Sequence, residues 1–317
     1  MEFIIIAVSL VGIVLGADWL VDGAVSIAKK YKVSDFVIGA AIVGIGTSMP
    51  ELTVSFSGAL KGNSDVAIGN VVGSNIFNVM GILGVTALFF PIAIQKQNMK
   101  FEIPLCIALS VILTLLSFDF FTEMNKPQIA WYDGLVLLAI FVVFMWYSFR
   151  RDRKNPAQTE SAQADKPMAL WKAAGLIIIG LGVLITSCDF FVDNAIVIAR
   201  RWGMSEAVIS ITLIACGTSL PELAASVVAA VKKNTQMALG NIVGSNIFNI
   251  TLILGLSSQV MPLTSAGITA VDYVVMIGAA IVPLLLGFTG KINRLAGAAM
   301  FLCFAGYNWY LLSTQIS

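Results

Sequence analysis

The chain has 317 residues, of which 58% are hydrophobic and 12% are charged, and its mean hydropathy is +0.91. Soluble domains carry about 25% charged residues, so this composition excludes an ordinary soluble protein and indicates a chain that crosses a membrane several times. The formal net charge of +1 and the absence of histidine give no support for a nucleic-acid ligand or a histidine metal site.

Ten apolar stretches are long enough to cross a bilayer, for which a helix needs about 20 residues. They lie at residues 3–28, 35–60, 66–90, 100–118, 130–149, 170–199, 206–231, 237–260, 269–288 and 292–313. A basic, polar linker at 150–168 separates a first membrane repeat at 1–149 from a second at 169–317. We therefore predict an all-α integral membrane protein with ten transmembrane helices, five in each half.

The distribution of Lys and Arg predicts the orientation of the chain, because cytoplasmic loops carry an excess of basic residues. If the loop at 29–34 is cytoplasmic, most other basic residues fall on the same side. The exceptions are Lys61, Lys126, Arg200 and Arg201. The prediction is a multi-pass protein of the plasma (inner) membrane, with both termini outside and the central linker cytoplasmic.

The second half of the sequence repeats the first at a constant offset of 171 positions. The stretch Gly-Thr-Ser-Met-Pro-Glu-Leu at 46–52 returns at 217–223 with one substitution, and the stretch at 70–78 returns at 241–249. Because each half has an odd number of spans, the two copies must cross the membrane in opposite directions. Inverted repeats with interrupted helices are typical of secondary transporters, whose binding site lies at the midplane between the repeats.

A proline and a glutamate interrupt the second span of each repeat. Pro50 cannot donate a backbone hydrogen bond, so we expect a new half-helix to start there and Met49 to leave the helical conformation. The carbonyl groups at 44–47 should then lack helical partners. Together with nearby hydroxyls and the Glu51 carboxylate they form a set of oxygen donors, which suits hard cations such as Ca²⁺ and Na⁺.

A simpler interpretation is that Ser48 and Glu51 form a capping box at the start of the half-helix. The spacing fits, and we expect Ser48 to have some capping role. A cap alone does not account for a glutamate at membrane depth in both repeats, which is typical of an ion or substrate path.

The third and eighth spans carry the repeated sequence Gly-Ser-Asn-Ile-Phe-Asn. Ser74 and Asn78 are four residues apart and share one helix face, and Ser245 and Asn249 do the same. We expect these faces to point towards the glutamates. Secondary candidates lie one position after each serine, at Asn75 and Asn246.

The same two spans also contain paired glycines at a spacing of four. Gly69 and Gly73 form one pair, and Gly240 and Gly244 form the other. Small residues at this spacing let membrane helices approach closely. We therefore expect these helices to combine a packing face with a binding face.

Two further carboxylate pairs repeat at the same offset, namely Asp18 with Asp22 and Asp189 with Asp193. They could line an ion path. Because they lie near aromatic residues towards the span ends, we expect them instead to cap helices or to pair with neighbouring lysines.

The paired G-T-S-x-P-E and G-S-N-I-F-N motifs resemble the α-repeats of the calcium/cation antiporter superfamily, and in particular the prokaryotic type of sodium/calcium exchanger. The resemblance covers the whole chain and implies exchange of Ca²⁺ for Na⁺ by alternating access, with the first and sixth spans as mobile gating helices. It implies carboxylate ligands from two residues, Glu51 and Glu222. The other implied oxygen ligands come from Thr47, Ser48, Thr218, Ser219, Ser74, Asn78, Ser245 and Asn249, and from the backbone of Gly44 and Ala215.

One position departs from the family pattern. Many sodium/calcium exchangers have Asp where this chain has Asn249, which leaves two site carboxylates. Two carboxylates can balance one Ca²⁺, but the counter-ion stays open, so a Ca²⁺(cation)/H⁺ antiporter on the same fold is the alternative.

Other function classes fit the sequence less well. An ion channel needs a continuous pore, and an intramembrane enzyme needs a nucleophile with a base or a metal site. We expect no enzymatic activity and no cofactor. The expected partners are the transported Ca²⁺ and Na⁺, with H⁺ in the alternative, and the lipid bilayer, but neither nucleic acid nor an obligatory protein partner.

Overall fold

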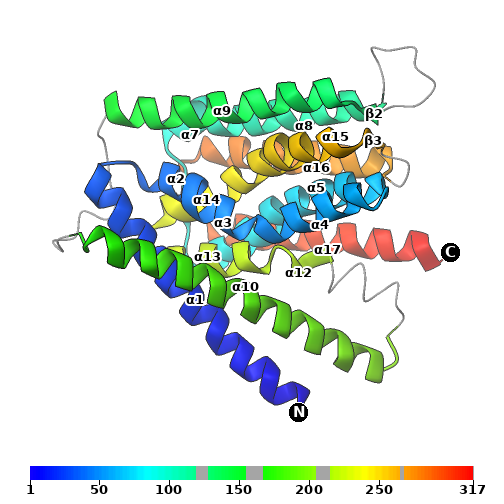
Figure 1. The fold of residues 1–317 in the computed structure, drawn as a ribbon, viewed down its shortest axis with the longest axis horizontal. Helices are drawn as coiled ribbons and strands as arrows, with labels where there is room; N and C mark the ends of the chain where they lie inside the picture. Colours follow the sequence, from blue (N-terminus) through cyan, green and yellow to red (C-terminus); the bar gives the residue numbers. More distant parts are fainter. Residues whose placement is uncertain (119–127, 155–166, 205–214, 265–267, 317) are drawn as a thin grey trace.

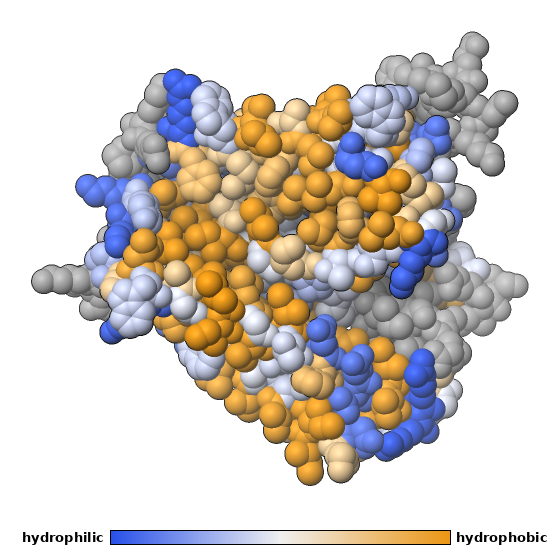
Figure 2. Space-filling view, in the orientation of Figure 1, coloured by the Kyte–Doolittle hydropathy of each residue, from blue (hydrophilic) through white to orange (hydrophobic). Residues whose placement is uncertain are grey.

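The computed structural model describes residues 1–118, 128–154, 167–204, 215–264 and 268–316, and these are almost entirely helical (Figure 1). Among the described residues, eight helices are long and apolar enough to cross a membrane, and a bent helix pair is a ninth candidate. Apolar side chains cover much of the face seen in Figure 2, as expected for a surface in contact with lipid. The prediction of an all-α membrane protein is confirmed.

The first half of the chain begins with one long helix and continues with shorter helices, two of which are extended by a π-helical segment. Its elements are α1 (Glu2–Tyr31), α2 (Asp35–Ile38), η1 (Gly39–Gly44), α3 (Ile45–Thr47), α4 (Met49–Leu60), α5 (Ser64–Ile76), η2 (Phe77–Leu83), α6 (Gly84–Phe89), β1 (Ile92–Ala93), α7 (Lys96–Lys100), α8 (Glu102–Phe118), β2 (Gln128–Ile129) and α9 (Trp131–Lys154). The segments labelled η are π-helical.

The described part of the second half follows a similar order. Its elements are α10 (Leu170–Arg201), α12 (Ala215–Gly217), α13 (Leu220–Val231), α14 (Thr235–Phe248), η4 (Asn249–Ile253), α15 (Leu254–Val260), β3 (Leu263–Thr264), α16 (Ala270–Gly287), β4 (Lys291–Ile292) and α17 (Arg294–Ile316).

Each predicted span other than 206–231 overlaps one of the helices or the bent pair that could cross a membrane. The exception falls partly on residues outside the described ranges, and its remainder carries α12 and the apolar helix α13. Helix α9 continues to Lys154, beyond the predicted end of the fifth span at 149. Lys126, Lys166 and most of the predicted linker also lie outside the described residues.

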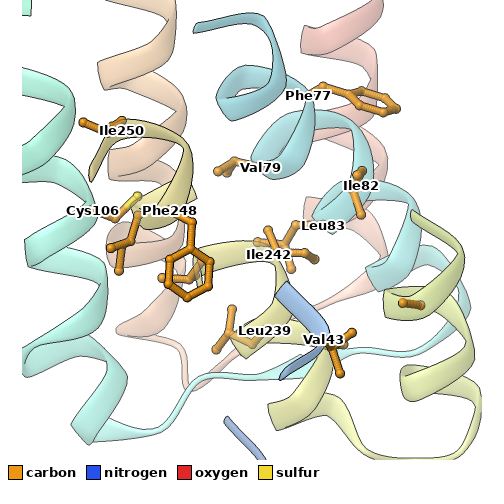
Figure 3. Close-up of a cluster of buried hydrophobic side chains, with 14 of the residues drawn as sticks. Val43, Phe77, Val79, Ile82, Leu83, Cys106, Leu239, Ile242, Phe248 and Ile250 are labelled. Atoms are coloured by element: carbon orange, nitrogen blue, oxygen red, sulfur yellow. The ribbon is translucent and has the colours of Figure 1, made fainter. Parts of the chain in front are cut away.

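The continuous span formed by α14, η4 and α15 is the centre of the protein. In its most apolar window 94% of the residues are buried, against 11% for α17, so α14 belongs to the interior and α17 to the periphery. Figure 3 shows Leu239, Ile242 and Phe248 from this span beside Val43 of η1 and Cys106 of α8. This apolar packing fixes α14 against the helices that lead to the candidate site.

The second glycine pair has the packing role predicted for it, whereas for the first pair the prediction is wrong at Gly73, where a Cβ atom would meet nothing within 4 Å. A Cβ atom at Gly240 would lie 2.2 Å from the backbone oxygen of Phe36 in α2, and one at Gly244 would lie 2.7 Å from Cα of Ala40 in η1. Such distances leave no room for a side chain, so α14 and the α2–η1 segment are in backbone contact.

Helices α1 and α10 form a long crossed pair along one side of the bundle (Figure 1). They approach closely at two glycines: a Cβ atom at Gly16 would lie 2.6 Å from the backbone nitrogen of Leu184, and one at Gly180 would lie 2.7 Å from that of Leu20. The backbones of α1 and α10 are therefore in direct contact with each other.

Two short antiparallel ribbons connect the halves of the chain. β1 pairs with β4 through Ile92 and Ile292, and β2 pairs with β3 through Ile129 and Leu263. Each ribbon thus joins one strand of the first half to one strand of the second. The strands β1 and β3 are separated by the offset of 171 positions found in the sequence.

Candidate ion-binding site

The predicted helix break is present in the second span. Helix α3 ends at Thr47 and α4 begins at Met49, and the helical segment Asp35–Thr47 is bent by 49° from α4. Pro50 lies in the first turn of α4, as predicted, but the helix resumes at Met49 and the break falls on Ser48. The expectation that Met49 leaves the helical conformation is wrong, because Met49 is the first residue of α4. Pro50 is tolerated there because first-turn N–H groups have no helical partner to lose.

The second copy has the same construction. Helix α12 ends at Gly217, α13 begins at Leu220, and Pro221 lies in its first turn. Ser219 has φ −94° and ψ 9°, close to the φ −81° and ψ 8° of Ser48. Two short half-helices therefore begin at the same motif, each with its glutamate in the first turn.

The hydroxyls before the two half-helices reach across to the glutamates of the opposite repeat. Ser48 Oγ donates to Glu222 Oε1 at 2.8 Å, and Ser219 Oγ donates to Glu51 Oε1 at 2.6 Å. Neither serine makes a side-chain cap bond to its own helix, so the expected capping role is wrong. A capping serine accepts from a backbone N–H, whereas these hydroxyls donate to a carboxylate, which is a charge-assisted hydrogen bond.

The serines of α5 and α14 join the same cluster. Ser48 Oγ lies 2.9 Å from Ser245 Oγ, and Ser219 Oγ lies 3.3 Å from Ser74 Oγ. Ser245 Oγ also donates to the backbone oxygen of Gly44 at 3.4 Å. The structure thus brings together the hydroxyl residues predicted from four separate spans.

Several oxygen atoms of the residues predicted as ligands are buried without a hydrogen-bond partner among the described residues. They are Oε2 of Glu51 and Glu222, Oδ1 of Asn78 and Asn249, and Oγ1 of Thr218. Both glutamates are 1% exposed, and neither pairs with a basic side chain in the described part of the protein. Burying an ionised carboxylate without compensation is costly, so the arrangement is suited to a bound cation.

Two asparagines that the sequence interpretation did not assign to the site hold its half-helices in place. Asn70 Nδ2 donates to the backbone oxygen of Glu51 at 3.1 Å, and Asn241 Nδ2 donates to that of Glu222 at 3.2 Å. Asn241 Oδ1 also accepts from Thr47 Oγ1 at 3.2 Å. The sequence held one signal for these residues: each is the first residue of a repeated stretch, at 70–78 and at 241–249. Helical periodicity alone gives them no role.

The backbone ligands predicted at Gly44 and Ala215 have different surroundings. The Gly44 oxygen accepts from Ser48 N at 3.0 Å, so the expectation that it lacks a helical partner is wrong. Helical hydrogen bonding continues through the short α3 segment up to the break. The second lone pair of this oxygen accepts from Ser245 Oγ, which links the Gly44 carbonyl to the hydroxyl cluster. Ala215 begins α12.

The repeated aspartate pairs differ between the two halves. Lys232 Nζ lies 2.7 Å from Asp18 Oδ1 and 2.6 Å from Asp22 Oδ1, which confirms the predicted pairing for the first copy. Asp189 and Asp193 have no such lysine among the described residues. Instead they line a cavity of about 470 Å³ that extends to the two helix breaks. Its other lining residues are Met49, Pro50, Thr53, Val54, Ile185, Val192, Ile196, Gly217 and Thr218.

The donor set of the cluster consists of oxygen atoms. Among the described residues, no group of three or more His, Cys, Asp and Glu side chains could hold a metal ion. The cluster instead combines two carboxylates with hydroxyl, amide and backbone oxygens, which are ligands of hard cations.

Comparison with known proteins agrees with this chemistry. The family described as sodium/calcium exchanger protein matches residues 1–150 and 172–313. The putative antiporter CaxA of Alkalimonas amylolytica is 38% identical, with 98% of each chain covered. The sodium/calcium exchanger MaX1 of Methanosarcina acetivorans is 32% identical over 96% of this chain and 97% of its own.

A solved structure matches the whole fold. The sodium-calcium exchanger NCX_Mj, soaked with zero Na⁺ and Ca²⁺, superposes with a TM-score of 0.80 at 30% sequence identity, covering 100% of this chain and 99% of its own. The same exchanger soaked with 2.5 mM Na⁺ and 0.1 mM Ca²⁺ gives a TM-score of 0.78 at 31% identity. With the family match extending over both halves, this chain is a multi-pass membrane antiporter that belongs to the sodium/calcium exchanger protein family.

Proposed function

We propose that this protein is a secondary active antiporter that exchanges Ca²⁺ for Na⁺ across the membrane by alternating access. The observation that carries the proposal is the crossed pair of hydrogen bonds from Ser48 to Glu222 and from Ser219 to Glu51. Each bond occupies one carboxylate oxygen and leaves the other, Oε2, buried without a partner among the described residues. These two oxygens supply a pair of negative charges for a cation.

The proposed ligands are the residues expected from the sequence. They are the carboxylates of Glu51 and Glu222, the side-chain oxygens of Thr47, Ser48, Thr218, Ser219, Ser74, Asn78, Ser245 and Asn249, and the backbone oxygens of Gly44 and Ala215. Two carboxylates balance either one Ca²⁺ or two Na⁺. The two kinds of ion therefore compete for the same charges, and this competition is what couples their movements in an antiporter.

The proposed architecture is ten transmembrane helices in two inverted repeats at 1–149 and 169–317, joined by a cytoplasmic linker at 150–168. Contacts repeated at the sequence offset support it. Asn70 and Asn241 make the same bond to the glutamate of their own repeat, and the strands β1 and β3, also at this offset, each pair with a strand of the opposite half. Such pairing is the pattern that a two-fold axis in the membrane plane produces.

Alternating access is supported by the difference between the two aspartate pairs. On one side Lys232 ties α13 to Asp18 and Asp22 of α1. On the other side a cavity lies between α4 and α10, lined by Asp189 and Asp193. With both termini outside, this cavity faces the exterior. We propose that α1 and α10 are the gating helices and that their movement opens the two sides in turn.

The ion dependence of Ca²⁺ flux tests the proposed function. In proteoliposomes loaded with Na⁺, we expect ⁴⁵Ca²⁺ uptake that stops when the Na⁺ gradient is collapsed and that persists when an imposed pH gradient is collapsed. Liposomes with a Glu51→Gln protein serve as the control for leak. Uptake that follows only the pH gradient, with Na⁺ inert, would establish the Ca²⁺(cation)/H⁺ alternative instead.

The asparagine that departs from the family pattern should affect the counter-ion. Asn249 is 1% exposed and its Oδ1 lacks a partner among the described residues, so Asn249→Asp adds a third negative charge to the cluster. We expect the variant to fold and to require more Na⁺, or H⁺, for each Ca²⁺, because the extra charge must be neutralised on the return step. The check is the reversal potential of Ca²⁺ flux in proteoliposomes, and an unchanged reversal potential would contradict the expectation.

A further inference from the structure

Four buried amide side chains cross between α5–η2 and α14–η4, the two spans that also carry Ser74 and Ser245 of the hydroxyl cluster. Asn75, Asn78, Asn246 and Asn249 are each 1% or 2% exposed. Asn249 Nδ2 donates to Asn75 Oδ1 at 3.1 Å, and Asn78 Nδ2 donates to Asn246 Oδ1 at 2.9 Å. Each amide near the site is therefore held by an amide of the opposite half.

Two backbone carbonyl groups fix the direction of these bonds. Asn75 Nδ2 donates to the backbone oxygen of Asn246 at 3.4 Å, and Asn246 Nδ2 donates to that of Asn75 at 3.2 Å. Because a carbonyl oxygen can only accept, the NH₂ groups of both residues must face it. Their Oδ1 atoms must then face the neighbouring amides.

The same reasoning fixes the amide orientations of Asn249 and Asn78. Asn75 Oδ1 can only accept, so Asn249 must direct its NH₂ group towards Asn75 and its Oδ1 the other way. Asn246 constrains Asn78 in the same manner. These are the two Oδ1 atoms that are buried without a partner among the described residues.

We propose that Asn75 and Asn246 are positioning residues that select which amide atom the site presents to the ion. They turn Asn249 and Asn78 so that an oxygen, and not an NH₂ group, faces the cation. The proposal rests on the proposed cation site and adds to it a specific role for two residues outside the ligand set.

A consequence distinguishes Asn from Asp at position 249. An amide has one oxygen, so its orientation decides whether it attracts or repels a cation. A carboxylate has two equivalent oxygens and needs no such control. A carboxylate would also face the Oδ1 acceptor of Asn75, an unfavourable contact. Asn75 is therefore required when residue 249 is Asn, and not when it is Asp.

A double-mutant cycle tests the proposal. Asn75→Leu removes the acceptor, and we expect Ca²⁺ affinity, measured by ⁴⁵Ca²⁺ binding to purified protein, to fall about tenfold, the effect of one hydrogen bond to a buried polar group. In the Asn249→Asp background the same change should leave affinity within about twofold or improve it. If Asn75→Leu does not fold, Asn75→Ala removes the same acceptor without added bulk.

The second asparagine provides a crossed control. Asn246→Leu should also weaken Ca²⁺ binding, but Asn78→Asp should suppress that loss and Asn249→Asp should not. Equal losses for Asn75→Leu in both backgrounds would mean a structural role and would overturn the proposal. Melting temperatures without Ca²⁺ separate changes in stability from changes in binding. Failure of the proposed function would appear differently, as absence of Ca²⁺ binding in the wild-type protein.

Discussion

Replacing either site glutamate with glutamine is expected to abolish Ca²⁺ transport. Glu51→Gln or Glu222→Gln removes one of the two buried charges that compensate the cation while keeping the size of the side chain. Breaking such a buried charge arrangement costs about 3–5 kcal/mol, so Ca²⁺ affinity should fall by a factor on the order of 100 or more. The measurements are ⁴⁵Ca²⁺ uptake into proteoliposomes and binding to the purified protein.

The same variants should lose Ca²⁺ affinity but gain thermal stability in the absence of ions. Without ions, an uncompensated buried carboxylate is unfavourable, so each Gln variant should melt at a higher temperature than the wild type. The rise in melting temperature on adding Ca²⁺ should disappear, since a ligand stabilises only the state that binds it. Glu102→Gln is the matched control, because Glu102 is also fully buried but is paired with Arg151. It should retain Ca²⁺ binding, and normal transport in both site variants would refute the site.

The second large effect is expected at the contact between α14 and α2. Gly240→Ala would place a Cβ atom 2.2 Å from the Phe36 backbone oxygen and 3.0 Å from its Cα. Both atoms belong to a helix backbone, so relief requires the helices to separate, at a cost of about 1–3 kcal/mol or more. The separation would also pull Asn241 away from Thr47. Thermal unfolding in detergent should show a marked loss of stability together with weakened Ca²⁺ binding.

A glycine in open surroundings provides the control for that substitution. A Cβ atom at Gly278 in α16 would meet nothing within 4 Å. Gly278→Ala should therefore be neutral or should stabilise the helix by up to about 1 kcal/mol through its higher helix propensity. If Gly240→Ala and Gly278→Ala melt at the same temperature, the close contact at Gly240 does not require a glycine.

The sequence was sufficient to predict the class of fold and the residues at the centre of the cluster. Long apolar runs identify membrane helices, and a glutamate beside a proline within such a run is so costly that it marks a functional position. Glu51 and Glu222 follow from this argument, and the repeat places them at equivalent positions. Ser74 and Ser245 follow from their helix face.

The partners of these residues could not be predicted in the same way. Spacing along one helix gives the face of a side chain, but it does not say which helix crosses that face. Ser48 therefore suggested a cap on its own helix, whereas it bonds to Glu222 from the other half. Asn70 and Asn75 acquire their roles only from contacts with residues brought close by the crossing of helices.

The two β-ribbons have a mechanical consequence for an exchanger. β1–β4 and β2–β3 fasten one half of the chain to the other at two separate places. In the proposed mechanism these ribbons would hold the two halves together while the gating helices move. The proposed gating helices α1 and α10 adjoin none of the four described strands in the sequence, so neither ribbon ties them to the other half. Movement of these two helices alone would change the side from which the site is reached while the proposed ligands keep their positions, so binding free energy would not be lost in reassembling the site at each turnover.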